Sequence, residues 1–457
     1  MRSSLRTSLV LVILLSFSAI TRAQTLAGVE QGIKPYGSYE GGSIDSISMV
    51  NGSITLNIPL LSYPQRGSKL HAGFRLVYAN PWLQPWAANC DPYTHHCGIT
   101  GYNLAYDLDP SNCGYNNLNG QTCGTAMGVG ADFGYGLNVV LLPGCCPQGV
   151  QYYKITDSGN AVHVMGYVGA GQYRSVDATG YLLSAASSSP DGNATLWDRQ
   201  GNKYFFSTWA LTKIEDPNGN QVTMNTNSQG AMTDTLGRVF PAETSTTDLS
   251  NCPASATTAS LWTPPGPSGG TSQFKTCWAT INISFNAGGT NPTSTAATNM
   301  VGLVLPNLTA WTFAYDNFGE LTTITLPTGG TISYTWTSIS GYCVAPQYVD
   351  PSSGANTGLW PYRRAVTSRT VNANDGTGPH TWNYVGNGGN GGQAIATDPL
   401  GNDTVHTERL SEAARFMKRN WTDTAVPILP EPLSKRPPRA TATALEEAPN
   451  TDSATSR

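Results

Sequence analysis

Charged side chains are scarce in this sequence. Lys, Arg, Asp and Glu together make up 12% of the 457 residues, and the formal net charge is −4. Lys and Arg form no stripe of the kind through which proteins bind nucleic acid or an anionic membrane surface. We therefore expect neither nucleic acid nor a membrane surface as a partner of this chain.

Runs of the helix formers Leu, Ala, Glu and Lys are nearly absent as well. Gly, with 49 residues, is abundant together with Thr, Ser, Asn and Tyr. Such a composition disfavours helices and is typical of many short strands joined by turns. The sequence therefore predicts an all-β fold.

Signatures of catalysis are also lacking. No His-Glu-x-x-His zinc motif occurs, and the six histidines have no recognisable nucleophile nearby in the sequence. We therefore expect no catalytic residue, no cofactor and no enzyme activity, and we rank an extracellular hydrolase last among the possible functions.

Only the N-terminus carries a long apolar run. Arg2 and Arg6 precede the apolar residues 9–20, and Thr21-Arg22-Ala23 fits a signal-peptidase site. This run is shorter than the roughly 20 apolar residues that a membrane-spanning helix requires, and no later segment is long and apolar enough. We interpret residues 1–23 as a signal peptide and expect a protein that is secreted, periplasmic or on the cell surface.

Nine cysteines follow the predicted cleavage site. In an oxidising compartment most of them should be paired, although the odd number leaves at least one free. Close spacing in the sequence favours three local disulfides, and Cys145 and Cys146 would then pair elsewhere, one of them with Cys343. The local candidates are Cys90 with Cys97, Cys113 with Cys123, and Cys252 with Cys277.

The first part of the mature chain, residues 24–150, is predicted to be an N-terminal β region with Cys-rich loops. Apolar residues alternate over 54–58 and again over 70–78, on either side of a turn at Gly67, which predicts two half-buried strands. Residues 81–150 are rich in Trp, Asn, Gly and Cys, and we interpret them as elaborated loops.

A turn that begins with Asp and carries Gly two or three residues later recurs through residues 151–407. Its Asp side chain is expected to accept a backbone hydrogen bond, and its Gly to take a positive φ angle. We interpret these spacings as hairpin repeats that form an extended twisted sheet, with an insertion near 241–300. The turns begin at Asp157, Asp177, Asp198, Asp216, Asp234, Asp316 and Asp398.

One stretch of this array resembles a unit of the YD-repeat or Rhs-type secreted proteins. It reads Trp311-Thr-Phe-Ala-Tyr315-Asp316-Asn-Phe-Gly319-Glu-Leu321-Thr-Thr-Ile324-Thr-Leu-Pro327-Thr-Gly329. The turns at Asp216 and Asp234 are similar to weaker units. The strand at Asn51-Gly52-Ser53, with Arg66-Gly67 and Val77-Tyr78, is similar to the opening of many secreted members.

The resemblance implies a spiralling β-sheet that closes into a shell around a toxin, or that is displayed on the cell surface and contacts glycans. Residues 408–457 depart from this pattern, because they contain no Gly and hold 15 of the 54 charged residues. We expect a short amphipathic helix over 408–419 and otherwise a disordered, non-repeat tail.

Three local groups of residues invite a chemical interpretation, and each also has a structural one. Cys90, His95, His96 and Cys97 are zinc-ligand types, but adjacent histidines point apart, so a disulfide-bound loop is favoured. Asp107, Asp109 and Asn112 could supply oxygen ligands to calcium, but a solvated turn is favoured because the full loop pattern is missing. Asp398-Pro399-Leu400-Gly401 resembles the self-cleavage motif of Rhs-type shells, and we interpret it as a plain repeat turn. We therefore expect no metal site.

Aromatic residues are dense between positions 82 and 106. Trp82 and Trp86 could stack on sugar rings, whereas packing between loop and sheet would explain them equally well. The sequence as a whole predicts a structural or interaction protein, the N-terminal part of an Rhs-type β shell, whose partner is a toxin or effector encoded elsewhere. The alternative is an exported carbohydrate-binding adhesin that contacts a surface glycan.

Overall fold

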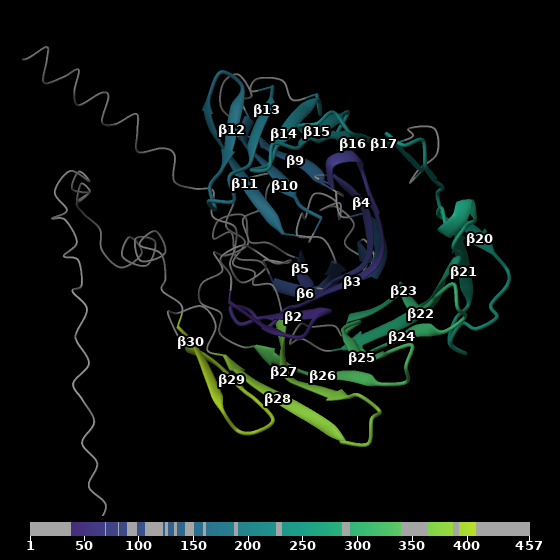
Figure 1. The fold of residues 1–457 in the computed structure, drawn as a ribbon. Helices are drawn as coiled ribbons and strands as arrows, with labels where there is room; N and C mark the ends of the chain where they lie inside the picture. The colour runs from purple at the N-terminus through teal and green to yellow at the C-terminus, as the bar shows by residue number, and fades with distance from the viewer. Residues whose placement is uncertain are drawn as a thin grey trace, which may run out of the picture. The chain divides into compact units, whose positions relative to one another are not determined.

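The structure is a computed structural model, and it confirms that the chain is all-β. Thirty strands and two short 3₁₀ turns, Arg66–Ser68 and Pro267–Gly269, account for the regular structure of the described residues (Figure 1). No helix in this part is long and apolar enough to cross a bilayer. The described residues are 38–68, 70–80, 82–88, 98–105, 122–123, 127–131, 135–141, 150–158, 161–186, 191–224, 231–285, 293–339, 363–386 and 393–407.

Five strands near the start of the chain form a sheet that we call the N-terminal sheet. Its central strands β3 and β4 pair across the turn at Gly67, where φ is 74°. The alternating apolar residues predicted there are buried, from Ile54 on β3 to Tyr78 on β4. The strands are β1 (Tyr39–Gly41), β2 (Asp45–Ser48), β3 (Ile54–Pro64), β4 (His71–Ala79) and β8 (Met127–Ala131).

The region 81–150, which the sequence indicated as loops, also contains strands. Three of them make a small sheet with one parallel pair, and the other two join neighbouring sheets. The small sheet consists of β5 (Trp82–Ala88), β6 (Gly98–Ala105) and β7 (Thr122–Cys123).

The predicted array is divided into two eleven-stranded antiparallel sheets, in which each strand lies beside its neighbours in the chain. The first eleven-stranded sheet ends at Phe240 and the second begins at Thr244. The first contains β9 (Gly136–Leu141), β10 (Val150–Thr156), β11 (Val162–Gly169), β12 (Gln172–Ser175), β13 (Leu182–Ala185), β14 (Ala194–Trp197), β15 (Lys203–Ser207), β16 (Ala210–Glu215), β17 (Gln221–Met224), β18 (Met232–Asp234) and β19 (Val239–Phe240).

The second eleven-stranded sheet begins within residues 241–300, for which the sequence predicts an insertion. Four consecutive strands start in this stretch, two of them twelve residues long. The sheet contains β20 (Thr244–Thr246), β21 (Thr258–Trp262), β22 (Phe274–Phe285), β23 (Thr293–Val304), β24 (Ala310–Tyr315), β25 (Leu321–Thr325), β26 (Thr331–Ile339), β27 (Arg363–Asn372), β28 (Pro379–Gly386), β29 (Gln393–Thr397) and β30 (Asp403–Thr407).

The Asp-initiated turns have the predicted geometry. At Asp216 the backbone N–H bonds the carbonyl of Asn220 at 2.9 Å, and Gly219 takes a φ of 81°. The Asp216 carboxylate accepts bonds from the backbone N–H groups of Asn218 and Asn220. This is a type I turn followed by a residue in the left-handed region, a common three-residue hairpin loop. The turns at Asp198, Asp234, Asp316 and Asp398 repeat the pattern.

The turn at Asp177 differs. Ala178 and Gly180 both have positive φ angles, of 61° and 82°. The hydroxyl oxygen of Ser175 accepts hydrogen bonds from the backbone N–H groups of Gly180 and Tyr181. The Asp177 carboxylate accepts hydrogen bonds from the backbone N–H and from the hydroxyl of Thr179. One apolar cluster includes buried residues from the N-terminal sheet and from both eleven-stranded sheets, so these sheets share a core.

Candidate functional site

The structure describes only part of the predicted candidate residues. Trp82 and Trp86 lie on β5, where they pair with Ala105 and Gly101, but their side chains are outside the described residues. Two predicted groups lie outside the described residues as well: Cys90, His95, His96 and Cys97, and the acidic turn with Asp107, Asp109 and Asn112. Among the residues that are described, no three His, Cys, Asp or Glu side chains form a group that could hold a metal ion.

One of the predicted disulfides is present, between Cys252 and Cys277. Cys277 is fully buried on β22, so the bond ties the loop before β21 to the sheet. Of the other candidates, Cys123 lies on β7 with its side chain not described, and the rest fall outside the described residues. These are Cys90, Cys97 and Cys113, together with Cys145, Cys146 and Cys343.

Lys275 reinforces the same loop. Its ammonium group donates to the Asp248 carboxylate at 2.6 Å and to the backbone carbonyl of Ser250 at 3.0 Å. The hydrogen bond from Lys275 holds the pKa of Asp248 well below its usual range. Although Lys275 also completes a Ser-x-x-Lys pattern with Ser272, a motif of certain hydrolases, its ammonium group is engaged by the loop.

A second pattern that sequence reasoning passed over is Gly266-Pro267-Ser268-Gly269-Gly270, which matches the Gly-x-Ser-x-Gly signature of hydrolases. In those enzymes the serine lies on a sharp turn between a strand and a helix. Here the segment is an exposed 3₁₀ turn between the strands β21 and β22. The pattern therefore marks a surface loop and lacks the setting that activates a nucleophile.

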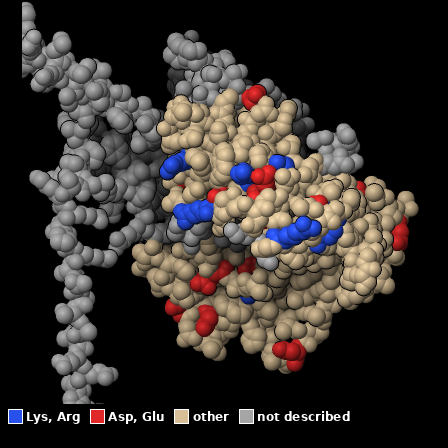
Figure 2. Space-filling view, turned by 45° about the horizontal axis from the view of Figure 1, so that its top comes forward, with Lys and Arg blue, Asp and Glu red and all other residues tan. Residues whose placement is uncertain are grey.

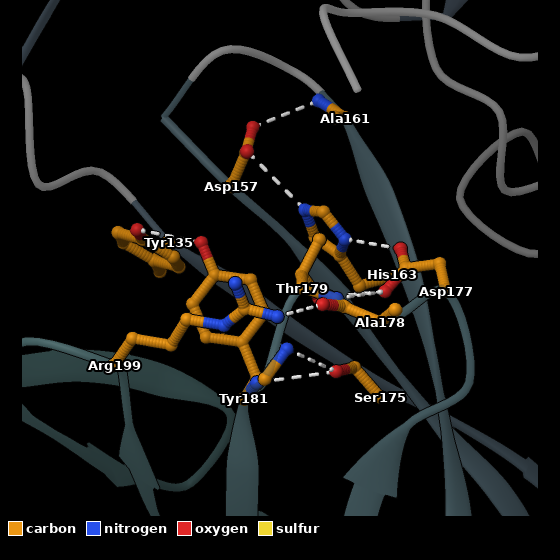
Figure 3. A network of polar contacts seen from close by, with 11 residues as sticks. Tyr135, Asp157, Ala161, His163, Ser175, Asp177, Ala178, Thr179, Tyr181 and Arg199 are labelled. Atoms are coloured by element: carbon orange, nitrogen blue, oxygen red, sulfur yellow. Dashed lines mark hydrogen bonds and ion pairs between the residues drawn. The ribbon is translucent and has the colours of Figure 1, made fainter. Parts of the chain in front are cut away.

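A network of polar contacts surrounds His163 on β11 (Figure 3). The imidazole is 1% exposed and lies between the carboxylates of two hairpin turns. Its Nδ1 is 2.6 Å from Asp177 Oδ2, and its Nε2 is 3.2 Å from Asp157 Oδ2. Because each ring nitrogen faces a carboxylate, both can donate only when the ring is a cation.

The charges in this network shift its pKa values. Burial alone would lower the pKa of His163, but the hydrogen bonds to Asp157 and Asp177 outweigh burial and raise this pKa from 6.5 to about 8. For Asp177, burial acts to raise the pKa, but the bonds from His163 and Thr179 lower it to about 2. The site therefore holds an ion pair at neutral pH.

Aromatic rings close the site. The rings of Tyr181 and His163 meet in an edge-to-face arrangement at a centroid distance of 4.9 Å, and the Tyr181 and Tyr135 hydroxyls are 3.1 Å apart. Burial raises the pKa of both tyrosines well above the usual value, so both stay neutral. Arg199 donates to the carbonyl of Ala178. His163 is almost fully enclosed, and its contacts join the two turns.

A second polar network joins the N-terminal sheet to the second eleven-stranded sheet. The Asp45 carboxylate on β2 accepts two bonds from the guanidinium of Arg369, at 2.5 and 2.9 Å. The Tyr334 hydroxyl donates to the same carboxylate at 2.7 Å. All three residues are buried. Burial and the Asp45 charge raise the pKa of Tyr334 well above its usual value.

The backbones of these two sheets also approach closely. Val366 donates to the carbonyl of Gly52 at 3.0 Å. Gly52 has a φ of 66°, and a Cβ atom there would lie 2.2 Å from the Cβ of Ala365. Glycine is therefore required for both the turn and the contact. At another point, the Tyr78 hydroxyl accepts the backbone N–H of Leu321 at 3.1 Å.

The first eleven-stranded sheet meets the other end of the N-terminal sheet, at the turn between β3 and β4. Here the partners are residues of the Asp-initiated turns. Gln65 donates to Asp234 at 2.9 Å, Asn220 donates to the carbonyl of Arg66 at 2.7 Å, and Arg238 donates to the carbonyl of Pro64 at 3.0 Å. The hairpin turns thus carry contacts between sheets as well as reversing the chain.

Charge on the molecular surface is sparse. Figure 2 shows one face, on which Lys and Arg form a few small groups separated by uncharged residues. The face in Figure 2 is mostly uncharged. No family model matches this sequence, and no curated protein matches it significantly.

Proposed function

We propose that this chain is a non-catalytic structural and interaction protein, secreted or on the cell surface, and that it forms the N-terminal part of an Rhs-type β shell. The observation that supports this role is the use of hairpin-turn residues as anchors for the N-terminal sheet. Asn220 and Arg238 each belong to an Asp-initiated turn and bond the backbone at Arg66 and Pro64.

Anchors of this kind suit a scaffold. A repeat array is stabilised mainly by contacts between neighbouring strands, whereas the N-terminal sheet here adds contacts between segments far apart in the chain, such as Asp45 with Arg369. The His163 network also fits a structural role, because both ring nitrogens contact carboxylates of the hairpin turns. We therefore propose that partners bind to surfaces of the sheets and that no residue has a catalytic role.

Co-purification with the polypeptide encoded directly downstream tests this proposal. The full chain would be expressed with and without that polypeptide, and the exported material would be analysed by N-terminal sequencing and mass spectrometry. We expect a mature start at Gln24 and a stoichiometric complex. Failure of the downstream product to bind, under conditions in which the chain is exported and folded, would contradict the shell role.

The adhesin alternative has its own measurement. A glycan array probed with the purified chain is expected to show no specific binding if the protein is a shell. Binding that is lost in the Trp82→Ala, Trp86→Ala double variant, with an unchanged far-UV circular dichroism spectrum, would replace the shell proposal with a carbohydrate-binding function. A double variant of two strand aromatics elsewhere, Trp311→Ala and Trp382→Ala, is the matched control.

A further inference from the structure

The last strand, β30, lies at the end of the second eleven-stranded sheet, with β29 on one side (Figure 1). No described strand pairs with its other side. Natural edge strands are protected against pairing by short length, proline, lysine or a bulge. Among the end strands of the three large sheets, β19, β20 and β1 have two or three residues, β9 pairs with β10 across a register shift, and β8 carries two glycines. In contrast, β30 has five residues, contains neither Pro, Lys nor Gly, and pairs with β29 without a register shift.

The hairpin turn fixes which backbone groups of β30 point away from β29. Asp398 donates to the carbonyl of Asn402, so this pair is hydrogen-bonded. In an antiparallel ladder hydrogen-bonded and non-hydrogen-bonded pairs alternate, so Thr404 and His406 bond β29. The N–H and C=O groups of Asp403, Val405 and Thr407 therefore point outward, toward a further strand.

A row of apolar side chains on one face of the sheet ends at the β30 edge. Val385 on β28 pairs with Ile395 on β29, and Ile395 pairs with Val405 on β30, so the three lie in a row on one face. Val385 is 64% exposed and Val405 is 50% exposed. Tyr384, Ala394 and Ala396 occupy the opposite face and are buried. Exposed β-branched side chains in register on a sheet favour continued pairing across strands.

We propose that the β30 edge is a self-association surface, on which β30 of a second copy of this chain pairs antiparallel about a two-fold axis at Val405. In this register Val405 lies opposite its own counterpart, and the apolar row runs on through the second copy. Asp403 then lies opposite Thr407 of the second copy, which avoids the like-charge contact between two aspartates that is unfavourable in a cross-strand pair. The sequence Asp403-Thr-Val-His-Thr407 is thus compatible with itself.

A two-fold interface uses the same patch on both molecules, which a strand paired with itself satisfies. The second eleven-stranded sheets of the two copies become one continuous sheet, in which the β30 edge of each copy is paired. This inference depends on β28, β29 and β30 and not on the shell role, because a chain that binds no downstream product can still self-associate through β30.

Sedimentation velocity of the full chain over a range of concentrations tests the proposal. We expect a reversible dimer for the wild type and a monomer for Val405→Pro. Proline removes the outward N–H of position 405 without removing a bond to β29, and edge strands tolerate it there. Val405→Thr keeps the branched side chain and the N–H, so it should still dimerise. A monomeric wild type, or a Val405→Pro variant that dimerises as well as Val405→Thr, would overturn the proposal.

Cysteine cross-linking tests the register separately. Val405→Cys places two cysteines opposite each other, with Cα atoms about 5.5 Å apart, within disulfide range. Asp403→Cys is the matched control, because its copies are offset by four residues, or about 13 Å along the strand. We expect a covalent dimer with a 405–405 linked peptide only for Val405→Cys. Equal cross-linking of both variants, or capture of a different protein at position 405, would contradict pairing with a second copy.

Discussion

The N-terminal sheet is held at two ends by networks of different kinds. At the Asp45 end, a buried carboxylate, a guanidinium and a phenol satisfy one another, with Asp45 fully enclosed and Arg369 7% exposed. At the Gln65 end, Arg238 is 26% exposed and bonds Asp234 and a backbone carbonyl. Burial decides how much each contact contributes, because water screens and replaces an exposed ion pair but not a buried one.

The largest effect is expected at the buried end. Asp45→Ala leaves the Arg369 cation and the Tyr334 hydroxyl buried without their partner, and breaking such a pair costs about 3–5 kcal/mol. Urea unfolding followed by tryptophan fluorescence measures this loss. Asp375→Ala is the control, since Asp375 caps an exposed turn through Thr377. If both substitutions lower the free energy of unfolding equally, the buried Asp45 network contributes no more stability than the exposed turn at Asp375.

An intermediate effect, and one that depends on pH, is expected inside the first eleven-stranded sheet. The pKa of folded His163 is raised from 6.5 to about 8, so its stabilising contribution is complete below pH 6.5 and is lost as pH rises through about 8. This rise in the pKa of His163 corresponds to about 2 kcal/mol of stability. The groups that face this ring are Asp157, Asp177 and Tyr181.

Hydrogen exchange at pH values from 6 to 9 measures this contribution. Amides of β10 to β13 should lose protection as the pH rises, after correction for intrinsic exchange, while amides near Asp45 should not. His163→Gln should abolish the pH dependence, whereas His380→Gln, at an exposed position, should leave it unchanged. A wild-type protein whose β10 to β13 protection is flat across this range would show that His163 does not carry the charge assigned to it.

The smallest effect is expected at the exposed end. Arg238→Ala removes an ion pair between a partly exposed guanidinium and the buried Asp234 carboxylate, together with a bond to the Pro64 carbonyl. Asp234 keeps its bonds from Gln65 and from the backbone N–H of Leu236, so we expect a loss of only about 1 kcal/mol. The same urea titration measures this change, with Arg238→Lys as the variant that keeps the charge. A loss as large as that of Asp45→Ala would mean that the two ends are equivalent.

Local features of the fold could be predicted from the sequence. The Asp-initiated turns were predictable because each is completed within five residues, as at Asp216 and Asn220. The alternation from Ile54 to Tyr78 was readable because one face of each strand is buried. Cys252 and Cys277 were predictable as partners because few residues separate them.

Contacts between distant segments could not be predicted in this way. Asp45 and Arg369 are separated by 324 positions, and neither has a distinctive neighbour in the sequence. His163 had a weak signal, because it lies on a strand between two Asp-initiated turns, but only the register of β11 brings both carboxylates to one ring. The sequence predicted one extended sheet, whereas the chain changes sheet between Phe240 and Thr244.

The order of synthesis gives the Asp45 network a consequence for folding. Each hairpin of the array can close as soon as its own residues have left the ribosome, since its strands are neighbours in the chain. Asp45 is made early, but it must wait for Arg369, which is synthesised more than three hundred residues later. Long-range contacts form slowly because a large loop must close first. We therefore expect the pairing of β2 with the surroundings of β27 to be a late step, after most hairpins of the array have formed.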